Sequence, residues 1–228
     1  RRAFTDQGIW RPHLLVNAGV PRAFAAAGGL TLVLGAQLVM ALLVMAVGPS
    51  PLLLALALGQ LALVLRLRGP FNGGSDSLSL LSLICLGVAS SVVPGSLLYL
   101  LALGYLVAQL TLSYFVAGVA KLAQRSWREG AALARFAALP KYGVPARAQA
   151  WLAHSSGGRL ASWSVLLFEC SFPLALLGPR VALAYLSVGA LFHLLNAALF
   201  GLNRFLWAWV ALYPLLLAAS HWLQSRAG

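Results

Sequence analysis

Long apolar runs follow one another along the chain, separated by short segments that contain Pro, Gly or Arg. A helix needs about 20 apolar residues to cross the hydrocarbon core of a bilayer. Seven runs approach that length and predict seven transmembrane helices: Phe24–Val47, Pro51–Leu65, Leu78–Val93, Ser96–Ala120, Leu160–Leu177, Val181–Phe200 and Phe205–Leu223. Pro and Gly between runs end one helix and allow the next to begin. The pattern therefore predicts an all-α, polytopic transmembrane bundle, with residues 1–228 as a single domain.

The composition excludes a water-soluble domain. Of the 228 residues, 61% are hydrophobic and 9% are charged, and the mean hydropathy is +0.88, whereas a soluble domain carries roughly 25% charged residues. The net charge of +12 lies in the gaps between apolar runs, which indicates membrane topology rather than nucleic-acid binding. Cys85 and Cys170 both lie inside apolar runs, so we expect neither a disulfide framework nor a metal site. The expected partner is the lipid bilayer.

Basic residues are concentrated on one side of this predicted topology, which we call the basic side. Only Arg180 and Arg226 lie on the other side. The basic side holds Arg1, Arg2, Arg11, Arg22, Arg66, Arg68, Lys121, Arg125, Arg128, Arg135, Lys141, Arg147, Arg159 and Arg204. Loops rich in Lys and Arg face the cytoplasm, so we expect a cytoplasmic basic side and a protein of the bacterial inner membrane. Because the chain starts with Arg rather than Met, we also expect further sequence before it.

One long polar stretch, residues 121–159, lies on the basic side. Trp127–Leu139 predicts an amphipathic helix in the membrane interface, and Ala146–His154 predicts a second short helix that Trp151 anchors at the headgroups. The segment 127–154 is either a connector that lies on the membrane surface or a lid over a site on the basic side.

Lys121 is the first candidate site residue, because groups that are costly to insert into lipid are candidates for function. It ends the fourth apolar run, in Tyr114-Phe-Val-Ala-Gly-Val-Ala-Lys121-Leu. A lysine there can extend its ammonium group to the membrane edge. Alternatively, it lies in a poorly hydrated pocket, where desolvation makes its amine a usable base near neutral pH.

Glu169 lies about midway along the fifth run, too deep for its short side chain to reach the headgroups. Pro173, four residues later, lacks the N–H that would bond to the carbonyl of residue 169. We therefore expect Glu169 to be protonated, paired with a cation, or hydrogen-bonded at an irregularity in the helix. Both a structural pairing and a proton or ligand role remain open.

Two further segments bring polar groups toward the basic side. His193, Asn196, Phe200 and Arg204 have a spacing that predicts one shared helix face, which serves either for interhelical hydrogen bonds or as a pocket wall. In the loop Asn72-Gly-Gly-Ser-Asp76, Ser75 or Asp76 is expected to cap the third helix. Polar groups from several segments on one side of a bundle indicate a cavity open to that side.

These segments resemble a known family. Tyr114-Phe-Val-Ala-Gly-Val-Ala-Lys121-Leu, followed by Trp127 and Gly130, is similar to the signature of the vitamin K-dependent γ-carboxylase membrane domain and of the related bacterial HTTM (horizontally transferred transmembrane) proteins. Phe192-His193-x-x-Asn196-x-x-Leu199-Phe200 resembles the second signature of the family. The Asn72–Asp76 turn and the opening Asp6-Gln-Gly-Ile resemble further segments of HTTM proteins.

The resemblance implies an active site in the membrane domain. In the carboxylases, a lysine that matches Lys121 deprotonates vitamin K hydroquinone, and oxygenation then gives a strong base that removes the γ-proton of a glutamate before CO₂ addition. The resemblance thus implies Lys121 as catalytic base, a vitamin K or menaquinone-type quinone, and His193, Asn196, Tyr114, Glu169, Asn72 and Asp76 as pocket candidates. Where the animal enzymes have two adjacent lysines, this chain has Ala120-Lys121. Their active site also faces the lumen, whereas the charge pattern here predicts a cytoplasmic one.

Three functions follow as hypotheses. The first is a membrane enzyme of carboxylase or epoxidase type, a lyase or oxidoreductase with a peptide or protein substrate. The second is a non-catalytic factor for the maturation or export of a secreted peptide. The third is a structural subunit of a membrane complex. Replacing Lys121 separates them, because the enzyme should lose function while the other two should tolerate the change.

Overall fold

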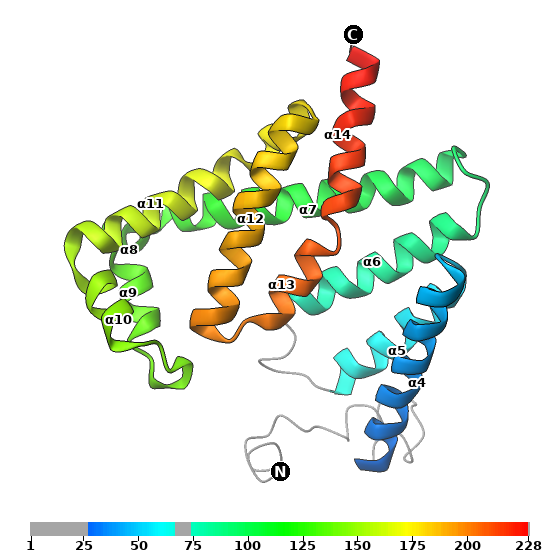
Figure 1. The fold of residues 1–228 in the computed structure, drawn as a ribbon, viewed down its shortest axis with the longest axis horizontal. Coiled ribbons are helices and arrows are strands. Elements are labelled where there is room, and N and C mark those ends of the chain that lie inside the picture. Colours follow the sequence, from blue (N-terminus) through cyan, green and yellow to red (C-terminus); the bar gives the residue numbers. More distant parts are fainter. Residues whose placement is uncertain (1–26, 67–73, 228) are drawn as a thin grey trace. The chain divides into compact units, whose positions relative to one another are not determined.

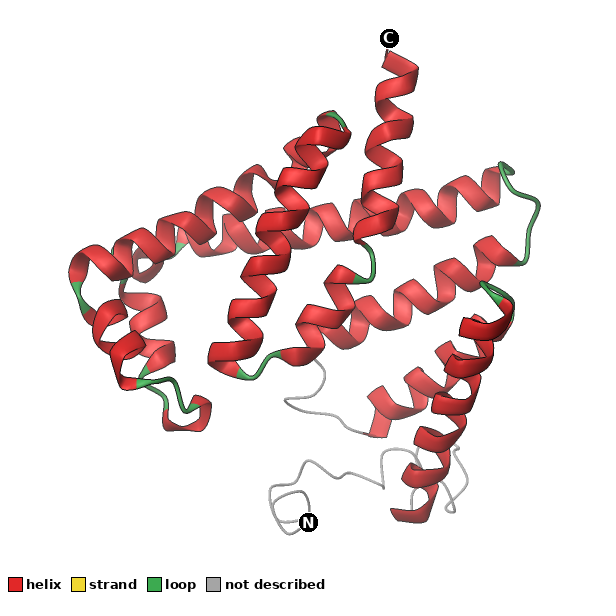
Figure 2. Ribbon diagram, viewed as in Figure 1, coloured by secondary structure: helices red, strands yellow, loops and turns green. Residues whose placement is uncertain are grey.

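The computed structural model describes residues 27–66 and 74–227 of the chain. Every regular element in these ranges is a helix (Figure 1), and the segments between them are loops and turns (Figure 2). The predicted all-α class is therefore confirmed. The chain forms two compact units, which we call unit 1 (residues 1–106) and unit 2 (residues 107–228), and each is described by itself.

Unit 1 consists of apolar helices, and its second helix packs against the first and the third. They are α4 (Ala27–Val47), α5 (Leu52–Arg66), α6 (Gly74–Ser90) and the first part of α7 (Leu97–Ala123), and α5 contacts both α4 and α6. The predicted start of the third helix at Leu78 is wrong, because α6 begins at Gly74. Ser75 and Asp76 consequently lie in the first turn of α6 instead of capping it, and a carboxylate there suits the positive end of the helix dipole.

Unit 2 contains the rest of α7 and a series of shorter and longer helices after it. These are α8 (Arg125–Arg128), α9 (Ala131–Ala137), η1 (Pro140–Tyr142), α10 (Ala146–Ala153), α11 (Ser155–Ser171), η2 (Phe172–Leu177), α12 (Pro179–Phe200), α13 (Asn203–Val210) and α14 (Tyr213–Ala227). The short helices α8, α9 and α10 gather around the first turns of α11 (Figure 1).

Four helical segments are long and apolar enough to cross a membrane: Leu97–Ala123, Ser155–Leu177, Pro179–Phe200 and Asn203–Arg226. They cover the last four predicted spans. Thr31–Val47, Leu52–Leu65 and Gly74–Ser90 form shorter apolar helices, so seven spanning helices stay a prediction. Large aliphatic side chains such as Leu167, Leu183 and Leu194 are exposed along the long helices, as contact with lipid requires.

Gly130, Gly201 and Pro214 mark where helices of unit 2 end or begin. Gly130 separates α8 from α9, so the predicted single helix Trp127–Leu139 is wrong. Its φ of +83° lies in the left-handed region, and an added Cβ would lie 2.6 Å from the carbonyl carbon of Gly158 in α11. Gly201, with φ +69°, ends α12, so Arg204 falls in α13 and does not share the helix face of His193. Pro214 lies in the first turn of α14, just after a turn divides the last predicted span.

Candidate functional site

An ion pair joins the end of α7 to the end of α11. Lys121 Nζ donates hydrogen bonds to both carboxylate oxygens of Glu169, at 2.7 Å to Oε1 and 2.6 Å to Oε2. The Lys121 side chain is 23% exposed, whereas that of Glu169 is 4% exposed. Of the three expectations for Glu169, the structure selects pairing with a cation, and the cation is Lys121.

Gly118 allows the two helices to approach closely enough for this pair. It lies one turn before Lys121, and an added Cβ would lie 2.7 Å from the backbone nitrogen of Cys170 and 2.8 Å from Cβ of Glu169. Contacts that short do not occur between real side-chain atoms and backbone. Only a glycine therefore lets α7 cross α11 at this distance.

The backbone around Glu169 is irregular, as Pro173 predicts. The α-helical bonding of α11 ends at Ser171, and the N–H of Phe172 bonds to the carbonyl of Glu169. The 3₁₀ helix η2 begins there, with Pro173 in its first turn. This i→i+3 bond supplies the carbonyl of Glu169 with a hydrogen-bond donor, because Pro173 has no N–H to donate.

Trp127 packs beside the pair. Its side chain is buried, and Lys121 Nζ lies 5.4 Å from the centre of its ring system. This distance permits a cation–π interaction. Trp127 therefore restricts water on one side of the ammonium group while it stabilises the positive charge.

A chain of three buried polar side chains lies deeper in unit 2. The Tyr114 hydroxyl lies 2.6 Å from Nε2 of His193 and 2.8 Å from the Tyr213 hydroxyl. Phe172 stacks on Tyr114 with ring centres 4.0 Å apart, and Trp209 lies 5.4 Å from His193. Aromatic rings thus enclose the polar chain, and Nδ1 of His193 is buried without a hydrogen-bond partner among the described residues.

The ion pair and two members of the polar chain, Tyr114 and His193, line one apolar cavity of about 660 Å³ in unit 2. Aliphatic and aromatic side chains form most of its wall. Five sequence-predicted site residues contribute to it, namely Tyr114, Lys121, Glu169, His193 and Asn196. Pockets for small molecules typically have volumes of about 300–1,000 Å³ and few polar groups in an apolar lining, so this cavity has the size and character of a ligand site.

The segment after α7 supplies part of the cavity wall. Leu133 and Phe136 of α9, Tyr142 of η1, and Trp151 and Leu152 of α10 all line the cavity. Tyr142 also packs edge-on against Phe200 at the end of α12, with ring centres 5.4 Å apart. The segment therefore has the position within unit 2 that the lid hypothesis requires, while its location relative to lipid stays a prediction.

The remaining predicted site residues have other surroundings. Asn196 lines the cavity, and its Nδ2 donates to the carbonyl of Phe192 in its own helix, at 2.9 Å, so this hydrogen bond lies within one helix. Asp76 is buried in α6 of unit 1 and does not belong to the cavity wall. Asn72 lies outside the described residues, as does the Asp6–Ile9 segment. Within residues 27–66 and 74–227, no group of three His, Cys, Asp or Glu side chains is placed to hold a metal ion.

Tyr213 and Gly189 are the site residues that the sequence analysis missed. Tyr213 begins α14 and completes the polar chain, and Gly189 of α12 leaves room for its hydroxyl, because an added Cβ would lie 2.5 Å from Tyr213 Oη. A hydroxyl group inside a predicted apolar span was the available signal for Tyr213. Gly189 gave none, since glycine is common in membrane helices.

Comparison with known protein families gives one match. The family model described as the HTTM domain matches residues 80–222. This range includes the Lys121–Glu169 pair and the chain of Tyr114, His193 and Tyr213. No similar curated protein and no similar solved structure is found.

Proposed function

The chain belongs to the HTTM family and, with its long apolar helices, is an integral membrane protein; we propose that it is an enzyme whose Lys121–Glu169 pair removes a proton from a quinone-type ligand in the cavity. The carrying observation is the position of the pair. A lysine and a carboxylate with two short hydrogen bonds line a cavity that is otherwise mostly apolar. Two ionisable side chains at that place are costly, so a function is the simplest reason for them.

In the proposed step the pair exchanges a proton internally, and the mostly apolar wall of the cavity favours this exchange. In water, an ammonium–carboxylate pair is far more stable than its neutral form. In an apolar site both charged groups lose hydration, which brings the charged and neutral forms closer in free energy. A proton that moves from Lys121 Nζ to Glu169 leaves a neutral amine, and that amine is the base.

The proton balance of the proposed step is simple. The O–H bond of a ligand hydroxyl breaks, and its proton forms a new N–H bond on Lys121, while Glu169 keeps the proton it received. The pair carries one additional proton afterwards, and Trp127 beside it stabilises the ammonium group that re-forms. Release of that proton to the basic side restores the starting state.

The cavity fits a quinone-type ligand. Its volume and its aromatic lining suit a flat ring, and His193 on its wall carries a buried ring nitrogen without a partner among the described side chains. When bound in reduced form, such a ligand supplies an acidic hydroxyl and, with oxygen, the oxidising chemistry implied by the resemblance to the carboxylases. Lys121, Glu169 and His193 would hold its polar groups, and Phe168, Phe192 and Phe205 its ring.

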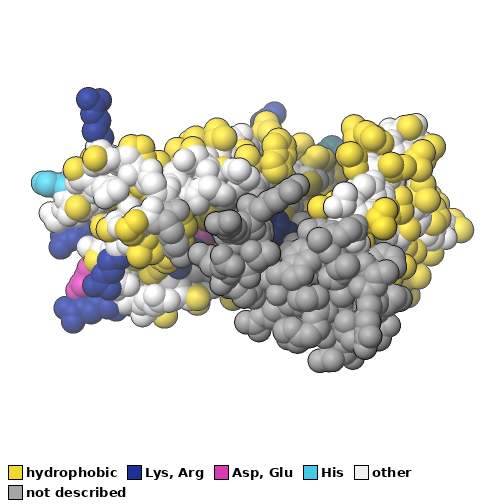
Figure 3. Space-filling model, turned by 90° about the horizontal axis from the view of Figure 1, so that it is seen from below, with side chains coloured by type: hydrophobic (Ala, Val, Ile, Leu, Met, Phe, Trp, Pro, Cys, Tyr) yellow, Lys and Arg dark blue, Asp and Glu magenta, His cyan; other side chains and the backbone are white. Residues whose placement is uncertain are grey.

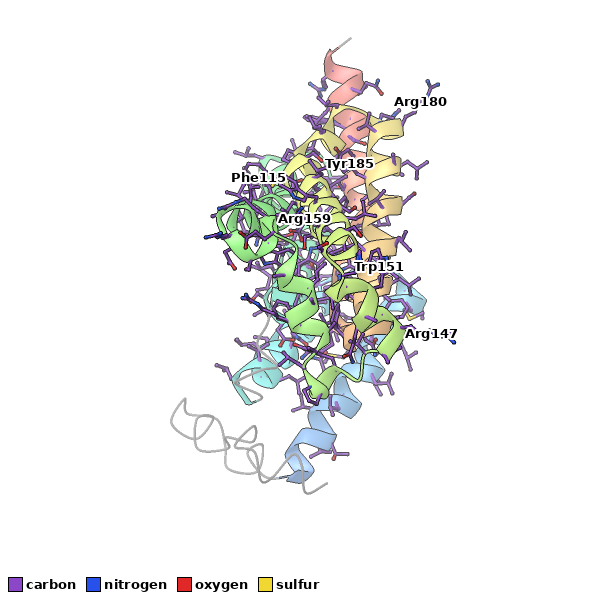
Figure 4. All side chains as sticks on the ribbon, turned by 90° about the vertical axis from the view of Figure 1, so that its left-hand side faces the viewer. Phe115, Arg147, Trp151, Arg159, Arg180 and Tyr185 are labelled. Carbon is purple, nitrogen blue, oxygen red and sulfur yellow. The ribbon has the colours of Figure 1, made fainter. Side chains whose placement is uncertain are left out.

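The charge distribution supports a site near the cytoplasmic face of a bacterial inner membrane. Arg125, Arg128, Arg135 and Arg159 belong to α8, α9 and the start of α11, where basic side chains gather in Figure 3. Arg180 lies at the start of α12, at the opposite end of that helix from Phe200, and points away from the helices (Figure 4). Since loops rich in Lys and Arg stay in the cytoplasm, the end of α7 that carries Lys121 faces that compartment.

The proposal is tested by identifying small molecules that stay bound to the protein. The wild type, Lys121→Met and the matched surface control Arg125→Gln are purified in mild detergent, and their extracts are compared by mass spectrometry. We expect a quinone in the wild type and in Arg125→Gln. The same three proteins are then assayed for oxygen-dependent consumption of a reduced naphthoquinone, which Lys121→Met should abolish.

The outcome also separates the enzyme from the two alternatives. Absence of any bound quinone, together with full function of Lys121→Met in its host, would contradict the enzyme. It would favour a factor for peptide maturation or export, or a subunit of a membrane complex. A peptide substrate, which the carboxylase resemblance implies, is part of the proposal only if the quinone is found.

A further inference from the structure

The hydrogen-bond chain of Tyr213, Tyr114 and His193 has two possible directions, and they differ in the groups left unsatisfied. Each tyrosine has one O–H donor, and a neutral imidazole has one N–H donor and one acceptor nitrogen. His193 is 3% exposed and lies among aromatic rings. A charged imidazolium without a carboxylate partner is disfavoured there, so the count is made for the neutral ring.

In the first direction, the Tyr213 O–H donates to Tyr114, and the Tyr114 O–H donates to Nε2 of His193. The imidazole proton is then on Nδ1, and of the donors on these three side chains Nδ1–H alone lacks a partner among the described residues. The two tyrosine O–H groups and Nε2 of His193 all have hydrogen-bond partners in this direction. The Tyr213 bond also polarises the Tyr114 hydroxyl and strengthens its donation to His193.

In the second direction, Nε2–H donates to Tyr114, and Tyr114 donates to Tyr213. The Tyr213 O–H then lacks an acceptor within the described part of the chain, and Nδ1 of His193 becomes an unsatisfied acceptor. Two buried groups lose hydration without compensation instead of one. The first direction is therefore the more stable.

We infer that Tyr114 and Tyr213 hold His193 in the Nδ1–H tautomer, and that this N–H selects a cavity ligand with an acceptor oxygen, such as a ring carbonyl. His193 belongs to the cavity wall, while its Nδ1 atom is buried behind neighbouring side chains, so a ligand supplies the missing acceptor by displacing part of that cover. Tyr114 and Tyr213 are positioning residues that act through His193. The ligand part rests on the proposed function, because it takes the cavity as a ligand site; the tautomer part does not.

The tautomer is measured in a protein that keeps His193 as its single histidine. The variant carries His13→Gln, His154→Gln and His221→Gln; His154 and His221 are exposed. With ¹⁵N-labelled histidine, NMR in detergent distinguishes a protonated from an unprotonated Nδ1 without added ligand. We expect Nδ1 to carry the proton, and Tyr114→Phe to make the Nε2–H form detectable. An Nε2–H ring or an imidazolium before that substitution would overturn the inference.

The ligand part is tested with two probes that differ only in oxygen. 2-Methyl-1,4-naphthoquinone has two carbonyl acceptors, and 2-methylnaphthalene has the same ring system with none. We expect the quinone to shift the His193 Nδ1 resonance and to bind about tenfold more tightly than the hydrocarbon, as one to two hydrogen bonds allow. The surface control Arg125→Gln should keep the Nδ1 shift, because Arg125 pairs with Glu129 and does not line the cavity.

The two possible failures are distinguishable. If the quinone binds measurably but leaves Nδ1 unshifted, or binds no better than the hydrocarbon, the ligand role of His193 is wrong while the quinone enzyme stands. If the quinone does not bind, the proposed function and the ligand role of His193 both fail, and the tautomer measurement still stands by itself.

Discussion

Two ion pairs whose basic residues, Lys121 and Arg125, lie close together on the chain show how strongly surroundings determine what a charged pair can do. Lys121–Glu169 and Arg125–Glu129 have nearly the same separation, 2.6 Å and 2.5 Å. In the first pair the side chains are 23% and 4% exposed, and in the second they are 83% and 51% exposed. Arg125–Glu129 spans one turn of a surface helix, whereas Lys121–Glu169 joins α7 to α11 on a cavity wall.

The difference lies in hydration rather than in geometry. Water and salt screen the exposed pair, so it contributes little to stability and has no reason to exchange a proton. Arginine also does not release its proton under physiological conditions. In the buried pair the carboxylate of Glu169 is almost fully enclosed and the cation is a lysine, the residue that the proposal takes as the base. Only the Lys121–Glu169 pair therefore combines a contribution to stability with a candidate base.

Removing one partner of the buried pair should give the largest effect. Lys121→Met leaves the Glu169 carboxylate buried without a cation, which costs on the order of 3 kcal/mol of unfolding free energy. The melting temperature in detergent should fall clearly below that of the wild type, and quinol consumption should cease. A melting temperature equal to that of Arg125→Gln would show that the pair is no more important than a surface contact.

Replacing both partners should separate stability from function. Lys121→Met combined with Glu169→Leu removes both charges and fills the space with apolar atoms, and such replacements are often neutral for stability. We expect the double variant to recover most of the melting temperature lost in Lys121→Met. Recovery of quinol consumption as well would mean that the pair serves packing alone.

Gly118→Ala tests the pair without altering a charge. The new Cβ meets Cys170 and Glu169 at less than 3.0 Å, so α7 and α11 must move apart, at a cost of about 1–3 kcal/mol. Both the melting temperature and the affinity for 2-methyl-1,4-naphthoquinone should fall. Gly104→Ala, earlier in α7 with open space around its Cβ position, is the matched control and should change neither.

Gly189→Ala extends the comparison to the polar chain, where we expect a smaller effect. Its Cβ would displace the Tyr213 hydroxyl, and loss of one buried hydrogen bond costs about 1 kcal/mol. The ion pair should be unaffected, so quinol deprotonation should persist while the His193 resonances change. Unchanged His193 resonances would separate Tyr213 from the chain.

Arg125→Gln should have the smallest effect. The substitution removes the exposed pair, and neither the melting temperature nor ligand binding should change measurably in buffer of physiological salt concentration. A fall comparable to that of Lys121→Met would mean that the contrast between the two pairs is wrong.

The sequence predicted the polar participants well and their partners incompletely. Lys121 and Glu169 were identified because ionisable groups are costly in lipid, yet 48 residues separate them, and apolar periodicity does not specify which helices touch. The pairing depends on Gly118, whose importance follows from a contact and not from a pattern. Tyr213 was missed for the same reason, since 99 residues separate it from Tyr114.

Interruptions between neighbouring helices were predicted least accurately, whereas the predicted end of α12 at Phe200 is confirmed. Apolar runs indicate where a helix can lie in lipid, but backbone conformation determines where it stops. Gly130 and Gly201 take left-handed conformations that end α8 and α12, and this separated Arg204 from the face of His193. The family resemblance was predicted from two short motifs and is confirmed by the HTTM match over residues 80–222.

The most direct test of the central claim compares the wild type with Lys121→Arg. Arginine keeps a positive charge beside Glu169 but does not release its proton. Reduced 2-methyl-1,4-naphthoquinone is bound to each protein without oxygen near neutral pH, and its absorbance spectrum reports the fraction that has lost its hydroxyl proton. We predict a deprotonated ligand in the wild type and a bound but protonated ligand in Lys121→Arg. Equal deprotonation in the two proteins would contradict Lys121 as the base.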